Sequence, residues 1–108
     1  MTHNFDQLIQ QFDAAMRGII AQAASLPTPV KFTRLLQMVE RHGGREAANI
    51  VLADSKIGQG LTNLALSGNE NLIFSVEYLV QQAPWNQLFT DQQLAIAARR
   101  VPLSALKN

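Results

Sequence analysis

The chain has 108 residues, of which 47% are hydrophobic and 16% charged, and its formal net charge is +1. This length suits a single domain, and the composition is that of a globular protein rather than a disordered one. The small net charge excludes nucleic-acid binding driven by bulk positive charge. The absence of cysteine excludes disulfides, thiolate metal sites and cysteine nucleophiles.

No run of apolar residues is long enough to cross a membrane. Residues 1–11 are polar and include Asp6, unlike the basic and then apolar layout of a secretory signal. We therefore expect a cytoplasmic protein, and the lack of cysteine agrees with that location.

Residues 4–24 carry the clearest helical period of the chain. We expect Asn4 or Thr2 to cap the first turn, and Asp6 to lie near the positive end of the helix dipole. The segment 26–29 contains two prolines and ends the helix. The apolar side chains recur every three or four residues and fall on one face, namely Phe5, Leu8, Ile9, Phe12, Met16, Ile19, Ile20 and Ala23.

A glycine pair, Gly43-Gly44, separates the next two predicted helices. Thr28 and Pro29 are typical of an N-cap and a first helical position, so the second helix is expected to begin there. Its buried face is predicted to contain Val30, Phe32, Leu35, Leu36 and Val39. The third helix covers about 45–53 and is expected to bury Ile50, Val51 and Leu52.

A turn at 54–58 leads into a short predicted helix, 59–67, which stops at Gly68. Residues 69–71 are expected to form a loop. The apolar run 72–74 is too short to predict a strand.

N-terminal capping signals mark the last two helices. Ser75 is the expected N-cap of a helix that ends at Ala83-Pro84, with Phe74 and Leu79 as its hydrophobic staple.

Thr90 and Gln93 predict a capping box, with Phe89 and Leu94 as the staple, for a helix that reaches Val101. Pro102 stops this helix, and the tail 103–108 is expected to fray. Just before the capping box, Trp85, Leu88 and Phe89 are expected to anchor the core.

These elements predict an all-α fold, a compact bundle of about six helices with a long amphipathic N-terminal helix. We expect one helical domain, 1–108, in which residues 1–26 form a leading helix and residues 28–101 a helical module. The one boundary expected within the chain is Ser25 to Thr28, which separates the first helix from the rest.

The sequence offers little support for catalysis. His3 and His42 have no second histidine at a metal-ligand spacing, and no cysteine is present to complete a zinc site. We expect His42 to interact with the C-terminal end of its helix. Four acids fall in predicted first turns, where negative charge is stabilising, namely Asp6, Glu46, Glu77 and Asp91. We therefore predict a protein that is not an enzyme, with no catalytic residue, metal or cofactor; an enzymatic interpretation would need two acids in a cleft beside His42.

Basic residues around the second predicted helix form a candidate nucleic-acid surface, because several of them share one stripe. Its members are Lys31, Arg34, Arg41, Arg45 and Lys56. Residues 44–67, two helices joined by a turn, are the candidate helix-turn-helix unit. The second helix of this unit has no arginine or lysine, the residues that recognition helices use on guanine and phosphate.

The leading helix carries a signal for association. Its face opposite the apolar stripe is small and almost uncharged, and Gly18 within it suggests close approach by another helix, because glycine costs about 1 kcal/mol relative to alanine in a helix interior. The residues in line on this face are Gln7, Ala14, Gly18, Ala21 and Ser25. A helix of about 30 Å is also longer than a small domain, so it would expose apolar surface unless another chain covered it. We therefore expect a homodimer or another protein partner, and no membrane. The predicted interaction residues are Phe5, Phe12, Met16, Gly18 and Ile19.

Several short motifs follow one another in a distinctive order between residues 28 and 101. They are Phe32 with Met38, Gly43-Gly44 before Ala47-Ala48, Gly60-Leu61-Thr62-x-Leu64, Ser75-Val76-Glu77-Tyr78-Leu79-Val80 and Trp85-x-x-Leu88-Phe89. In this order they resemble an uncharacterised small helical module of bacterial and phage proteins that is sometimes appended to nuclease domains. The segment 69–73 departs from the module, which has a shorter, glycine-led acidic turn there. The resemblance implies a DNA-processing or mobile-element setting and contributes no catalytic residue.

Two functions are therefore expected. The first is a non-enzymatic protein-interaction module that associates through its first helix. The alternative is a small DNA-binding regulator that uses the helix-turn-helix-like unit at 44–67.

Overall fold

The structure, a computed structural model, describes the backbone of residues 2–106 and the side chains of residues 5–104 and 106. The described residues form six α-helices: α1 (Thr2–Ala24), α2 (Thr33–His42), α3 (Gly44–Ala53), α4 (Gln59–Ser67), α5 (Val76–Val80) and α6 (Asp91–Arg100). They also form three 3₁₀ helices: η1 (Asn69–Phe74), η2 (Trp85–Leu88) and η3 (Leu103–Leu106). This part of the chain contains no strand, so the predicted all-α fold is confirmed.

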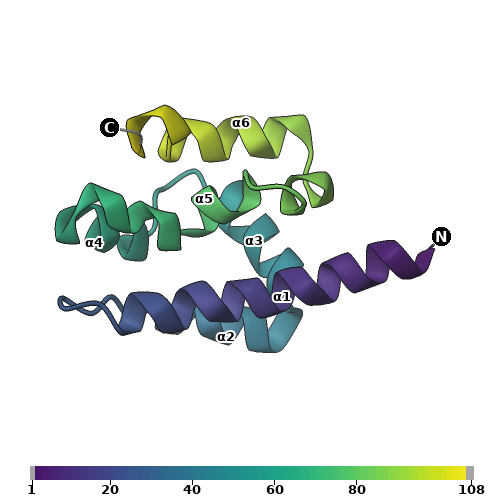
Figure 1. Cartoon of the computed structure of the whole chain (residues 1–108), viewed down its shortest axis with the longest axis horizontal. Coiled ribbons are helices and arrows are strands. Elements are labelled where there is room, and N and C mark those ends of the chain that lie inside the picture. Colours follow the sequence, from purple (N-terminus) through teal and green to yellow (C-terminus); the bar gives the residue numbers. More distant parts are fainter. Residues whose placement is uncertain (1, 107–108) are drawn as a thin grey trace.

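The helices are arranged with α1 along one side of the molecule and α6 along the other, and α3, α4 and α5 lie between them (Figure 1). α2 packs against α1 and α3. α1 has 23 residues and runs along the longest dimension of the molecule, 42 Å. Its N-terminal end extends beyond the other elements (Figure 1). Within the described residues, no helix is both long and apolar enough to span a bilayer.

The apolar stripe of α1 forms the centre of the core. Phe12 and Met16 are fully buried, in one cluster with residues of α2, α3, α5 and α6. The Phe12 ring packs on Trp85 and Phe89, with ring centroids 5.7 and 5.4 Å apart. This confirms the expected packing role of the residues before α6. It also joins the leading helix and the module at 28–101 in one core.

The hydrogen bonds of two predicted N-caps are present in the structure. The Ser75 hydroxyl accepts a hydrogen bond from the Tyr78 N–H at 3.0 Å and begins α5. The Thr90 hydroxyl accepts from the Gln93 N–H at 3.1 Å, and the Gln93 side chain accepts from the Thr90 N–H at 2.9 Å. This capping box begins α6. The predicted bounds of α4 and the turn before it are also correct.

Other predicted starts are wrong. α1 already includes Thr2 and Asn4, so neither residue is its N-cap, and Asp6 lies beyond its first turn. α2 begins at Thr33, not at Thr28 and Pro29. The reason is Val30, which is buried and donates its N–H to the Ala23 carbonyl at 2.9 Å. These contacts hold the chain extended as it turns back from α1.

The second half of the chain departs from prediction in its short elements. Residues 69–71 belong to η1 rather than a loop, and residues 103–106 form η3 rather than a frayed end, while 107–108 lie outside the described residues. α5 ends at Val80, before Ala83-Pro84, because the chain tightens there into i→i−3 hydrogen bonds. In α3, Ile50 is exposed, and Ala47, Ala48 and Leu52 are buried.

The glycine pair forms the junction between α2 and α3. Gly43 closes α2 with φ +88°, a conformation that side chains disfavour, and it donates its N–H to the Val39 carbonyl. Gly44 begins α3 where α3 approaches α1 closely, and a Cβ at Gly44 would lie 2.8 Å from the Asp13 Cα. Because the neighbour is backbone, the helices cannot make room by a side-chain rotation.

Gly44→Ala is therefore expected to destabilise the fold by about 1–3 kcal/mol, the usual range for overpacking. Gly58→Ala is the matched control, because a Cβ at Gly58 meets nothing within 4 Å. Urea denaturation followed by circular dichroism measures both. If the two variants were equally stable, the close packing of α3 on α1 at Gly44 would be contradicted.

Candidate functional site

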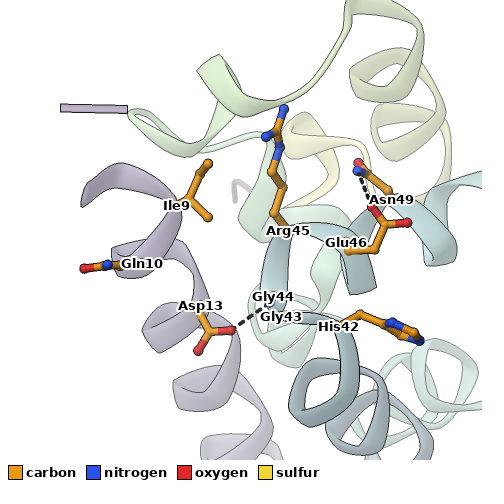
Figure 2. A pocket seen from close by; sticks show the side chains of 9 residues that line it. All are labelled: Ile9, Gln10, Asp13, His42, Gly43, Gly44, Arg45, Glu46 and Asn49. Carbon is orange, nitrogen blue, oxygen red and sulfur yellow. Dashed lines mark hydrogen bonds between the residues drawn. The ribbon is translucent and has the colours of Figure 1, made fainter. Parts of the chain in front are cut away.

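A pocket of about 440 Å³ lies between α1 and the junction of α2 with α3 (Figure 2). Asp13, His42 and Glu46 all line this surface, which we call the His42 pocket. The structure thus brings two acids to one concavity beside His42, the arrangement that an enzymatic interpretation requires. What these groups bind decides whether the pocket can support chemistry.

The Asp13 carboxylate is already engaged with the backbone of α3. Its Oδ1 accepts a hydrogen bond from the Gly44 N–H at 2.7 Å, and its Oδ2 accepts from the Arg17 Nε at 2.9 Å (Figure 2 shows the first). The N-cap residue of α3 is Gly43, which has no side chain to accept from the first free N–H groups. Asp13 therefore caps α3 from another helix, 31 residues away in sequence.

The other polar groups of the His42 pocket do not converge. Glu46 lies in the first turn of α3 and accepts from the Asn49 side chain at 3.4 Å. His42 is exposed at the end of α2, and its ring points away from Asp13 (Figure 2). The Arg45 guanidinium lies 5.2 Å from the centre of the Phe5 ring, a cation–π contact. Among the described side chains, no three histidine or acidic residues lie together as metal ligands.

The predicted nucleic-acid residues lie in three places. Lys31, Arg34 and Lys56 line one groove of about 330 Å³, formed by α2, α3, the start of α4 and residues 75–77. Arg45 lines the His42 pocket, and Arg41 is exposed on α2 and lines neither concavity. Lys31 precedes α2, so the prediction that it lies on one helical face with the arginines of α2 is wrong.

The unit at 44–67 does not have the arrangement expected of a helix-turn-helix. In that motif two consecutive helices pack against each other across a short turn. Here α4 packs mainly on η1 and scarcely touches α3. The pairing of α4 with η1 follows from Leu64, which is buried among Ala23, Val30 and Leu72.

The predicted interaction residues of α1 are divided between the interior and the surface. Phe12, Met16 and Ile19 are buried in the core of the chain itself, so as interaction residues they were wrongly predicted. Their spacing is that of a core stripe, which sequence alone does not distinguish from a stripe that binds a partner. Phe5 is 43% exposed and Gly18 is exposed.

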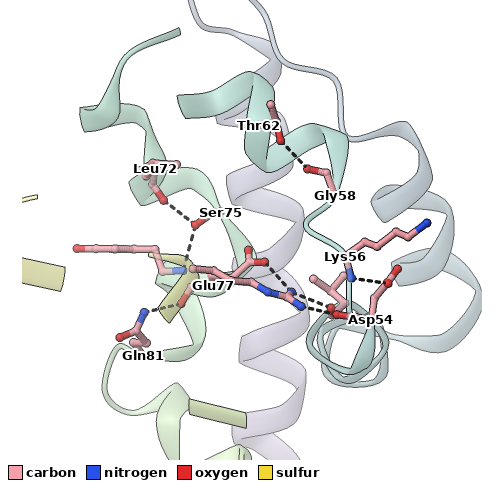
Figure 3. A network of polar contacts seen from close by, with 11 residues as sticks. Asp54, Lys56, Gly58, Thr62, Leu72, Ser75, Glu77 and Gln81 are labelled. Carbon is pink, nitrogen blue, oxygen red and sulfur yellow. Dashed lines mark hydrogen bonds and ion pairs between the residues drawn. The ribbon is translucent and has the colours of Figure 1, made fainter. Parts of the chain in front are cut away.

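A buried ion pair between α5 and α6 was not predicted. Glu77 is only 3% exposed, and its Oε2 lies 3.3 Å from Nη1 of Arg100. The same guanidinium donates to the carbonyls of Val51, at 3.1 Å, and Asp54, at the C-terminal end of α3. Figure 3 shows this network together with the Ser75 cap. Glu77 was expected in a first turn, and it lies there, but the sequence gives no sign of its distant partner.

Asp13→Ala is expected to lower the free energy of unfolding by about 1–2 kcal/mol, because it removes the cap of α3. Asp13→Asn keeps a carbonyl oxygen as acceptor and should lose less. Asp6→Ala, at an exposed position of the same helix, is the control. Denaturant titration measures all three, and an Asp13→Ala variant as stable as the control would show that the cap contributes nothing.

Arg100→Ala is expected to cost about 3 kcal/mol or more, because it leaves the Glu77 carboxylate buried without its partner. Arg99→Ala, at the exposed neighbouring position, should change stability by less than about 0.5 kcal/mol. Thermal unfolding compares the two. The double variant Arg100→Met with Glu77→Leu should recover part of the lost free energy of unfolding. If the losses of the two single variants simply added in the double variant, the two residues would not interact.

Comparisons with known proteins give no relative from which a function could be transferred. No protein-family model matches the chain, and no curated protein or solved structure matches it either. The resemblance of residues 28–101 to a helical module therefore stays a prediction.

Proposed function

We propose that this protein is a non-enzymatic protein-interaction module that self-associates through the exposed face of α1. The observation that carries the proposal is the surface around Gly18. At about 100° per residue, seven exposed residues on or directly after α1 lie within about 60° of Gly18 and share this surface, which we call the Gly18 face. They are Gln7, Gln11, Ala14, Gly18, Ala21, Gln22 and Ser25.

The Gly18 face suits close contact between two helices. None of its side chains is charged, and a Cβ placed on Gly18 would meet nothing within 4 Å. Within the described structure the glycine therefore serves no internal packing. A glycine in an exposed helix interior lowers helix stability by about 1 kcal/mol relative to alanine, which a second helix packed against it would offset.

The proposal corrects which side of α1 binds the partner. The buried stripe with Phe12 and Met16 holds the domain together, and the opposite face is free for a second copy. A two-fold axis across the Gly18 face would pair this surface with itself, as in most homodimers. The proposed DNA-processing or mobile-element setting rests on the resemblance alone.

A non-enzymatic role agrees with the use of the acids in the His42 pocket. Asp13 is engaged by the Gly44 N–H and by Arg17, and Glu46 by Asn49. Asp13 caps α3 and Glu46 lies in its first turn, so both carboxylates have structural roles, and this supports the proposal.

The alternative, a DNA-binding regulator, has less support. Its five cations are divided among the groove, the His42 pocket and the outer surface of α2, so they do not form one phosphate-binding surface. A recognition helix would also present arginine or lysine, and α4 contains neither.

Gly18→Leu is expected to raise the dissociation constant of the dimer at least about tenfold, because the added side chain separates the two helices. Sedimentation equilibrium over a wide range of protein concentrations measures this constant. The monomer should remain folded, since the space around Gly18 is open.

Ala24→Leu is the matched control, because Ala24 is exposed on α1 but lies about 120° around the helix from Gly18. This variant should dimerise like the natural protein. Sedimentation of the natural protein as a monomer at its highest soluble concentration would refute self-association. Deletion of residues 1–26 is not a useful test, because it removes Phe12 and Met16 from the core.

A further inference from the structure

The groove lined by Lys31, Arg34 and Lys56 has an apolar interior, and we call it the Phe32 groove. Its apolar lining includes Phe32, just before α2, and residues of α2, α3 and α4, namely Met38, Ile50, Val51 and Leu61. Phe32 closes one side by packing directly on α4, where Gly60 has no side chain and an added Cβ would lie 2.2 Å from the ring. The Phe32 ring therefore joins the segment before α2 to α4 at this side of the groove.

Part of this apolar lining faces solvent. Ile50, on α3, is 38% exposed, and Phe32, Met38 and Val51 are half-buried. Met38 adds a flexible thioether, which adapts to the shape of a bound side chain. An exposed apolar concavity of this kind favours the apolar side chains of a partner over a hydrated polar ligand.

The charge around the Phe32 groove is positive. Lys31, Arg34 and Lys56 are exposed, and none forms an ion pair among the described residues. Glu77 also lines the groove, but Arg100 neutralises it. Asp54 is the remaining acid, and one of its oxygens accepts the Lys56 backbone N–H at 2.9 Å. Three cations therefore face a single carboxylate that has no cationic partner.

We propose that the Phe32 groove binds an acidic amphipathic helix of another protein. The apolar lining would take the side chains of one helical face, spaced at i, i+3, i+4 and i+7, and the cations would contact acidic residues beside them. Rim charges of this kind would chiefly fix orientation and speed the encounter.

A second copy of this chain does not fit as the occupant. Its acids are scattered, and no helix carries more than the two on α1, Asp6 and Asp13. The apolar faces of its helices are in its own core. Duplex DNA fits less well than a peptide, because its phosphates would meet the cations but leave the apolar lining unused.

The Phe32 groove and the Gly18 face share no residue. No residue of α1 lines the Phe32 groove, so the monomeric Gly18→Leu variant should bind the same peptide with the same affinity as the natural protein. Loss of peptide binding in that variant would overturn the proposed site, and its monomeric state would still report on the Gly18 face.

The test uses a fluorescein-labelled peptide of about sixteen residues, with leucine on one helical face and glutamate elsewhere. Fluorescence anisotropy with the full chain should show saturable binding that weakens as salt is raised. A peptide with the same leucines and lysine in place of each glutamate should bind at least about tenfold more weakly. Equal binding of the two peptides would overturn the proposal, because it would show apolar adhesion without charge recognition.

Two variants locate the binding. Ile50→Glu and Arg34→Glu should each lower the affinity for the acidic peptide about tenfold, because they place negative charge in the groove. Their controls are Leu66→Glu, at an apolar residue that is 80% exposed on α4 and outside the groove, and Arg41→Glu, about 10 Å further along α2. Both controls should keep the affinity of the natural protein. If the control variants lowered the affinity for the peptide as much as the groove variants did, the assignment of the binding site to the Phe32 groove would be overturned.

Two further measurements cover the remaining outcomes. Amide chemical shifts of the natural protein, titrated with the acidic peptide, should change at residues of the groove, and changes confined to other surfaces would overturn the proposal without any variant. A labelled DNA duplex should bind weakly and without dependence on Arg34. If instead the duplex binds in the groove more tightly than the acidic peptide, the surface is a nucleic-acid site and the peptide proposal is wrong.

Discussion

The relative positions of α3, α5 and α6 depend on the Arg100 guanidinium, which is held between these three helices. It neutralises the buried Glu77 of α5 and satisfies two carbonyls at the end of α3. A carboxylate as deeply buried as Glu77 is tolerated only with a charged partner and good hydrogen bonds. The position of α6 relative to α3 and α5 is therefore specified by charge as well as by apolar packing.

This network also shapes the surface proposed to bind a partner. Val51, Asp54 and Glu77 belong both to the network and to the lining of the Phe32 groove. Arg100 thus removes the negative charge that Glu77 would bring to the groove. The charge of the Phe32 groove therefore depends on a residue of α6 that does not itself line the groove.

Local signals in the sequence were enough to predict most helices. Ser75, Thr90 and Gln93 act within their own first turns, so their spacing alone predicts the caps that the structure contains. The predicted start of α2 was wrong because the Val30 N–H is hydrogen-bonded to the Ala23 carbonyl. No local sequence pattern reveals this contact.

The contents of the candidate sites were harder to predict for the same reason. Apolar periodicity placed Phe12 and Met16 on one face of α1 correctly, but it cannot say whether a core or a partner covers that face. The cations of the Phe32 groove come from two segments, and only the fold brings Lys56 close to Arg34. The cap that Asp13 gives to Gly44 joins residues whose separation in sequence carries no signal.

α3 has an unusual dependence on the rest of the molecule, because distant side chains hold both of its ends. Asp13 of α1 accepts from its first N–H, and Arg100 of α6 donates to its last carbonyls. A helix of ten residues is marginal in isolation. Loosening α1 or α6 is therefore expected to free one end of α3 and to weaken this helix as well.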